Sequence, residues 1–241
     1  MLAAWTSAWV AGHVGPDEVI DAVTGADAPH QVAGLGGTDP QLIPLREVLL
    51  VWRRASAPVR VVLPVAGDLR GVPGPAGFRS AALQAGEAVC GGAIGIVPED
   101  IDYAPSSAPP TVLWQAFAIE AAPPDYQQLN DAQYDLTTAL RACATELSAL
   151  QAPGWKPDVT DALAEARRAG EHLELPPGFP PRAVALLAQA ERLQSVLDIT
   201  AEDPGGGAID RSGILARREA MRPLETAVRR ARVAGYNATA C

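Results

Sequence analysis

The segment 63–77 comes nearest to a ligand-binding motif, because it is a glycine-rich loop between a β-branched run and a short helical pattern. Loops of this kind can direct backbone N–H groups at a phosphate. An anionic ligand or nucleotide at loop 67–77 would contact Gly67, Asp68, Arg70, Gly71 and Gly74. The spacing matches neither a P-loop nor GxGxxG, and Pro73 and Pro75 lack the N–H groups that a phosphate needs. An anion site and a structural turn both stay open, and the pattern favours the turn.

Cys90 is the one cysteine whose surroundings suggest a nucleophile, since Gly91 and Gly92 would leave its sulfur accessible. A nucleophilic thiol also needs a base and a site for the oxyanion. No local signature connects Cys90 to any of the three histidines, which are His13, His30 and His172. The sequence therefore favours a buried, inert thiol, predicts no catalytic residue and leans against an enzyme.

Carboxylates stand near two histidines, His13 and His172, but neither forms an HExxH-like pair. An acidic group also follows Pro98 and is typical of a hydrated loop rather than an acid–base pair. It consists of Glu99, Asp100 and Asp102. We expect no metal and no cofactor.

Basic side chains gather in the last helical segment of an otherwise acidic chain. They are Arg217, Arg218, Arg222, Arg229, Arg230 and Arg232. This strip could meet the chain's own acidic half, an acidic protein partner or nucleic acid, in that order of preference. Trp155, between Gly154 and Lys156, adds a candidate exposed anchor. The predicted partner-binding residues are Trp155, Arg217, Arg218, Arg222 and Arg229.

Composition places the chain among globular proteins of one or two domains. It has 241 residues, of which 48% are hydrophobic and 20% are charged. The net charge of −9 disfavours binding to nucleic acid or to an anionic membrane surface. The three cysteines are far apart, so neither a disulfide framework nor a zinc site is expected. The arginine- and alanine-rich, lysine-poor usage is typical of a high-GC bacterial genome.

The first residues carry neither a basic lead nor an apolar run of about 20 residues, so we expect no signal peptide and no membrane anchor. This pattern predicts a soluble, cytoplasmic protein. Asn237-Ala-Thr239 has the form of a glycosylation acceptor, but without a secretory signal the match is interpreted as coincidence.

Residues 1–124 alternate between helical and β-branched patterns. Helices are predicted at 2–11, from Pro16, at 42–55 and at 78–85, and strands at 30–35, 59–65, 88–97 and 111–119. Alternation of strands and helices favours parallel pairing. The last two strands, which only a loop joins, could pair antiparallel.

After Pro123 the helical period takes over. Helices are predicted at 125–151, at 158–169, from Pro181 and from a cap at Ser212, and Pro223 should bend the last one. Their one-sided apolar stripes predict a bundle. The predicted fold class is thus α+β in two parts, with a small α/β domain over 1–124 and a helical bundle over 125–241.

The leading functional hypothesis is a noncatalytic module that binds a protein partner or a second copy of itself. It depends on the absence of convergent reactive groups and on the abundance of apolar helical stripes. The alternatives are an enzyme or sensor that binds a small anion at loop 67–77, and weak nucleic-acid binding through the last helix.

Overall fold

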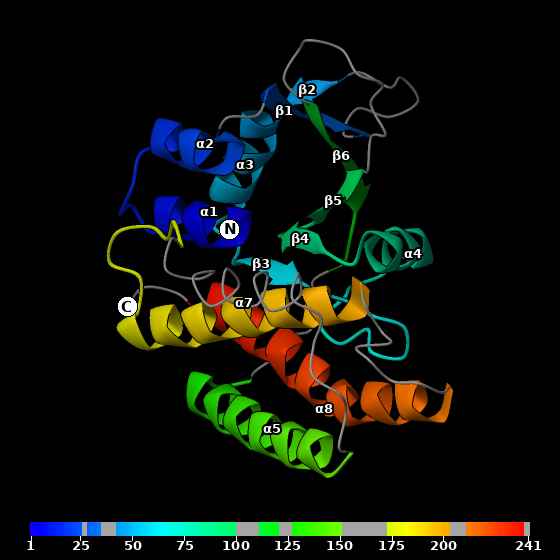
Figure 1. Cartoon of the computed structure of the whole chain (residues 1–241). Coiled ribbons are helices and arrows are strands. Elements are labelled where there is room, and N and C mark those ends of the chain that lie inside the picture. The colour runs from blue at the N-terminus through cyan, green and yellow to red at the C-terminus, as the bar shows by residue number, and fades with distance from the viewer. Residues whose placement is uncertain are drawn as a thin grey trace. The chain divides into compact units, whose positions relative to one another are not determined.

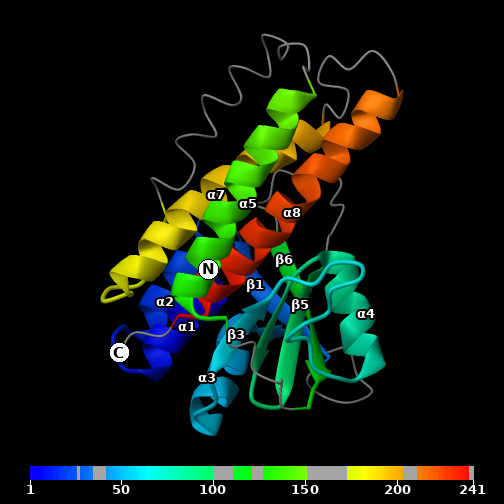
Figure 2. The same cartoon turned by 90° about the horizontal axis from the view of Figure 1, so that it is seen from below.

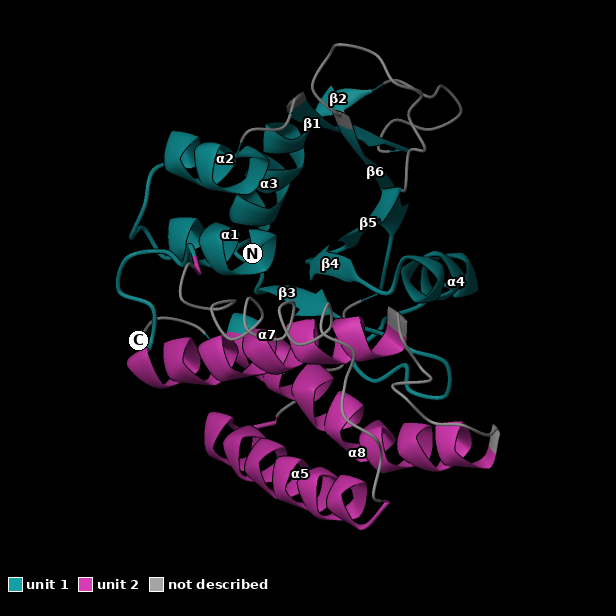
Figure 3. Cartoon of the chain, in the orientation of Figure 1, with its two compact units in different colours: residues 1–126, 174–180, 236–241 teal, residues 127–173, 181–235 magenta. Residues whose placement is uncertain are grey.

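The structure is a computed structural model that describes residues 1–25, 28–34, 42–99, 111–120, 127–150, 173–202 and 211–238 (Figure 1). Its chain divides into two compact units, coloured separately in Figure 3. The first unit comprises residues 1–126, 174–180 and 236–241, and the second comprises 127–173 and 181–235. Two short segments from the second half of the chain therefore belong to the first unit.

The first unit contains four described helices and six described strands. The helices are α1 (Leu2–Val10), α2 (Pro16–Thr24), α3 (Leu45–Ala55) and α4 (Ala76–Ala85). The strands are β1 (Ala28–Ala33), β2 (Ile43–Pro44), β3 (Val59–Val62), β4 (Ala88–Gly91), β5 (Ile94–Glu99) and β6 (Thr111–Ala118). The strands form one sheet in the order β2-β1-β6-β5-β4-β3.

The sheet is mixed, because β1 and β6 run parallel whereas the other neighbours are antiparallel. Helix α4 lies on one side of the sheet and helices α1 to α3 lie on the other (Figures 1 and 2). This arrangement confirms the predicted α/β character of the first half and its short mixed sheet.

Two aromatic rings pack directly on glycines of the β4–β5 hairpin. A Cβ atom placed on Gly91 would lie only 2.7 Å from carbons of the Trp52 ring of α3. A Cβ atom placed on Gly95 would lie 2.6 Å from the nearest carbon of the Phe78 ring of α4. Gly95 pairs with Cys90, the neighbour of Gly91, so the two glycines face opposite sides of the sheet. Each ring therefore packs against the strand backbone on its own side of the sheet, at a glycine that has no side chain in the way.

Two details of the predicted sheet are wrong. The single strand expected at 88–97 is a hairpin of β4 and β5, turned at Gly92 with φ +55°. The strand expected from 59 ends at Val62, and it pairs antiparallel with β4 rather than parallel. Alternating strand and helix patterns indicated a crossover, but the backbone pairing is decided by contacts that local patterns do not encode. The antiparallel pairing of the last two strands is confirmed by β5 and β6.

The second unit has three described helices, α5 (Leu129–Ala149), α7 (Pro181–Glu202) and α8 (Arg211–Tyr236, whose last residue falls in the first unit). Pro181 opens α7 as predicted. Helix α8 starts at Arg211, so Ser212 lies in its first turn rather than at the cap, and α8 bends along its length with Pro223 inside it (Figure 1). The helix expected at 158–169 lies outside the described residues.

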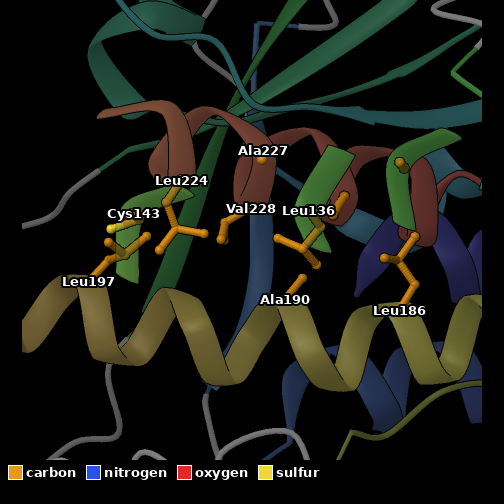
Figure 4. Close-up of a cluster of buried hydrophobic side chains, with 10 residues drawn as sticks. Leu136, Cys143, Leu186, Ala190, Leu197, Leu224, Ala227 and Val228 are labelled. Carbon is orange, nitrogen blue, oxygen red and sulfur yellow. The ribbon is translucent and has the colours of Figure 1, made fainter. Parts of the chain in front are cut away.

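Apolar side chains from all three helices meet in one buried cluster (Figure 4). Leu186, Ala190 and Leu197 of α7 point toward the side chains of α5 and α8. The remaining labelled members are Leu136 and Cys143 of α5 and Leu224, Ala227 and Val228 of α8. The seven-residue spacing of Leu136 and Cys143 accounts for their common face on α5. With the first unit, these helices confirm the predicted α+β fold class.

Candidate functional site

The glycine-rich segment after β3 is held firmly at both of its ends. Leu63 and Pro64 are buried where it leaves the sheet, and Val72 is buried where it returns, against Phe78 and the other apolar residues below α4. We call residues 64–72 the double-turn loop. Its anchoring fixes where the exposed residues between these ends lie.

Two consecutive turns form the loop. In the first, Val65 and Asp68 exchange backbone hydrogen bonds of 2.9 and 3.1 Å, and Gly67 has φ +85°. In the second, the Val72 N–H donates to the Leu69 carbonyl at 3.2 Å, and Gly71 has φ +75°. A positive φ at the third position, together with a negative φ at the second, is typical of a type II turn and favours glycine at the third position. The two glycines therefore have a conformational role that needs no ligand.

The Asp68 carboxylate holds Arg70 in a two-pronged ion pair. The Arg70 Nε and Nη2 atoms lie 2.9 and 2.7 Å from the two carboxylate oxygens, and the Arg70 backbone N–H also donates to Asp68 Oδ1 at 3.3 Å. Paired N–H···O bonds of this type fix the orientation of a guanidinium. An anion at Arg70 would have to compete with the carboxylate of Asp68.

The loop also turns two aliphatic side chains to the outside. Val65 is 42% exposed and Leu69 is 41% exposed, one in each turn. Because Arg70 is paired and four of the loop's N–H groups donate within it, the loop offers the exposed Val65 and Leu69 side chains as apolar surface on a backbone held by these bonds. Surface of this kind contacts proteins at little entropic cost.

The residues predicted for anion binding are only partly brought together. Gly67, Asp68, Arg70 and Gly71 lie in the double-turn loop, whereas Gly74 lies beyond it, where its carbonyl accepts a hydrogen bond from the Glu120 N–H at 3.4 Å. The N–H groups of Val65, Asp68, Arg70 and Val72 all donate within the loop.

The arginines predicted to bind a partner do not form one exposed strip on α8. Arg217 is buried, with 5% of its surface exposed, and Arg229 is half-buried. Arg218 and Arg222 are exposed, and Arg222 lies 3.6 Å from Glu219. Trp155, the remaining residue of this predicted set, lies outside the described residues.

The Cys90 thiol is buried under α4, and burial raises its pKa to about 12. Burial also raises the pKa of Cys143, with Glu146 and Glu225 adding to the effect. His30 on β1 accepts a hydrogen bond from the Trp114 indole at 3.4 Å, and β6 and β5 separate β1 from β4. At about 4.8 Å per strand, His30 is roughly 14 Å from the strand of Cys90.

The other chemical candidates are also dispersed. His13 and Glu99 are exposed at separate places, and His172, Asp100 and Asp102 lie outside the described residues. Within the described part of the chain, no three His, Cys, Asp or Glu residues are grouped as metal ligands would be. No helix among those residues has both the length and the apolar character that crossing a bilayer requires.

Sequence reasoning missed the role of Asn237. Its side-chain amide bonds to both backbone groups of Val61, although 176 residues separate the two positions. The only signal was the resemblance of Asn237-Ala-Thr239 to a glycosylation acceptor, and that signal concerns different chemistry. A contact of this kind between distant segments leaves no local pattern.

Fold and site together define a two-part α+β protein, with a surface loop of two hydrogen-bonded turns on its sheet unit and a second, helical unit. The chain belongs to the family of Rv1486c-like proteins: residues 1–129 match the N-terminal domain of that family and residues 130–233 match its C-terminal domain.

The similar proteins come from mycobacteria. The "Uncharacterized protein Rv1486c" of Mycobacterium tuberculosis strain H37Rv is 31% identical over 98% of this chain and 95% of its own length. The "Uncharacterized protein ML1804" of Mycobacterium leprae and the "Uncharacterized protein MAV321" of Mycobacterium avium are each 27% identical over the same shares. These relatives confirm the bacterial type that composition predicted. No solved structure matches the chain significantly.

Proposed function

We propose that this chain is a noncatalytic, cytoplasmic protein-interaction module that contacts its partner through Val65 and Leu69 of the double-turn loop. The observation that carries the proposal is the combination, in that loop, of two turns closed by backbone hydrogen bonds with outward aliphatic side chains. The partner is another protein or a second copy of this chain.

The loop is suited to protein contact because its conformation is set before binding. Two type II turns, the Asp68–Arg70 ion pair and buried residues at both ends restrict the backbone. A preorganised contact loses less conformational entropy on association than a mobile one. The carboxylate beside Arg70 favours this function over the binding of a small anion.

The test removes the apolar surface and leaves the turns in place. The double variant Val65→Ser, Leu69→Ser should keep the parent's unfolding free energy to within about 1 kcal/mol, because both side chains are exposed. Leu83→Ser is the matched control, since Leu83 is 37% exposed on α4.

Binding is read by a photo-crosslinking amino acid placed at position 69 of the full chain in its source cell, and at position 83 as the control. We expect one protein adduct from position 69, either to a second copy or to another protein, and its loss when Val65 is serine. Equal adducts from both positions, or none from position 69, would contradict the proposal.

Calorimetric titration with ATP and with inorganic phosphate tests the anion alternative. We expect no heat of binding from the parent chain. Binding heat that disappears in Arg70→Gln would replace the protein-contact proposal with an anion site.

A further inference from the structure

Strand β3 is one edge of the sheet, and among the described residues no strand lies beside the outer side of its backbone. In an antiparallel ladder alternate residues direct their N–H and C=O groups to opposite sides. Val59 and Val61 are the alternate pair whose backbone groups are bonded by side chains rather than by β4. Exposed edges of this kind invite pairing with another chain, and proteins commonly cover them.

Asn237 covers the edge at Val61. The Val61 N–H donates to Asn237 Oδ1 at 2.8 Å, and Asn237 Nδ2 donates to the Val61 carbonyl at 2.9 Å. A primary amide presents one acceptor and one donor side by side, as a peptide unit of a further strand would. The Asn237 side chain therefore reproduces the two bonds of one antiparallel strand pair.

A second side chain covers the edge at Val59. The Ser7 hydroxyl, on α1, donates to the Val59 carbonyl at 3.1 Å. Three backbone groups of the edge are thus bonded by two side chains. Ser7 is 52 positions from Val59 in the sequence, and Asn237 is 176 positions from Val61. Both contacts lie within the first unit.

We propose that Asn237 is an intramolecular plug that keeps the edge of β3 from pairing with β3 of a second copy. With the plug withdrawn, Val61 can form the same two bonds with Val61 of another copy, in antiparallel strands related by a two-fold axis. This register sets Arg60 opposite Val62 of the other copy, and so avoids the repulsion between two arginines directly opposite each other. The inference is independent of the double-turn loop.

The test replaces Asn237 in the full chain with a side chain of similar size that has no hydrogen-bonding groups. Asn237→Leu should convert a chain without β3-mediated association into one that dimerises at tens of micromolar, as measured by sedimentation velocity. Asn130→Leu is the control, because Asn130 is exposed on α5 in the second unit.

Hydrogen exchange at the Val61 amide identifies the surface. In dilute Asn237→Leu this amide should exchange at least about tenfold faster than in the parent, because its acceptor is gone. At dimerising concentrations the exchange should slow again, since the second copy supplies a new acceptor. The Asn130→Leu control should match the parent in both states.

Two outcomes would overturn the proposal: a folded Asn237→Leu that stays monomeric, or a dimer in which the Val61 amide still exchanges rapidly. If that variant fails to fold, Asn237→Asp takes its place. Its ionised carboxylate can accept from the Val61 N–H but cannot donate to the Val61 carbonyl. It should dimerise more weakly than expected for the leucine variant, and a strictly monomeric, folded Asn237→Asp would also count against the plug.

Discussion

At the scale of single residues, Cys90 shows how the fold controls a reactive group. The thiol lies on the α4 face of the sheet, in the cluster that contains Phe78, and burial raises its pKa from 9.0 to about 12. The thiolate is the nucleophilic form of cysteine. At neutral pH this side chain is protonated and behaves as a small apolar residue.

Cys90 should therefore resist alkylation in the folded protein. At pH 8, a pKa of about 12 leaves roughly a thousand times less thiolate than a pKa of 9 does. We expect iodoacetamide to label Cys90 at least about a hundredfold more slowly in native protein than in denaturant. Peptide mass spectrometry measures both rates, and equal rates would show that the thiol is accessible.

The same pKa gives a stability effect with a definite sign. The folded chain keeps the Cys90 proton to a higher pH than the unfolded chain, so the stabilisation is complete below pH 9 and is lost as the pH rises toward about 12. Over this window the parent should lose stability relative to Cys90→Ala, which has no proton to lose. Parallel denaturant titrations at several pH values provide the comparison.

At the scale of helices and strands, local patterns predicted most elements but not their pairing. The apolar periods located α1, α3, α5 and α7, and proline and glycine marked several ends. The sequence predicts one strand where the β4–β5 hairpin lies, because Gly91 and Gly92 stand inside a continuous apolar run. Pairing depends on contacts between distant segments, so the edge position of β3 could not be predicted from its own residues.

The candidate loop illustrates the same limit. Its glycines were recognised as turn residues, and the structure assigns a positive φ to Gly67 and Gly71. In the anion-site alternative Asp68 and Arg70 would face a ligand, whereas the structure pairs them with each other. Charge and spacing identified the segment, but the partner of each charge depends on side-chain geometry.

Two ion pairs of the helical unit should differ in their contributions to stability. Arg232 of α8 donates to Glu191 of α7 at 2.9 Å, with side chains 27% and 18% exposed, whereas Arg222 and Glu219 lie 3.6 Å apart and are each 71% exposed. Screening by water weakens an exposed pair far more.

Glu191→Gln should lower the unfolding free energy by about 1 kcal/mol, and Glu219→Gln should change it by less than about 0.5 kcal/mol. Double-mutant cycles with Arg232→Ala and Arg222→Ala isolate each coupling energy. Equal couplings would show that burial does not distinguish the two pairs.

At the scale of the whole molecule, the first unit is assembled from three separate stretches of chain. Residues 174–180 supply the Glu174 carbonyl, which accepts a hydrogen bond from the Trp5 indole at 2.9 Å, and a buried Phe179. Residues 236–241 include Asn237. The first 126 residues therefore lack two segments that bond to them in the complete chain.

Removal of the last five residues should destabilise the first unit. Deletion of residues 237–241 leaves the Val61 N–H and carbonyl without Asn237, at a cost of about 1–3 kcal/mol. Deletion of 239–241, which retains Asn237, is the control. Tryptophan fluorescence in a Trp155→Phe background follows the transition, because the four other tryptophans belong to the first unit. Identical midpoints for the two deletions would contradict the expectation.

The glycines beneath Trp52 and Phe78 also constrain how this family can diverge. A methyl group at Gly91 or Gly95 would overlap the ring above it. Substitution at either glycine must therefore accompany or follow the replacement of its aromatic partner by something smaller. Along any lineage that keeps this hairpin, each ring and its glycine should change together.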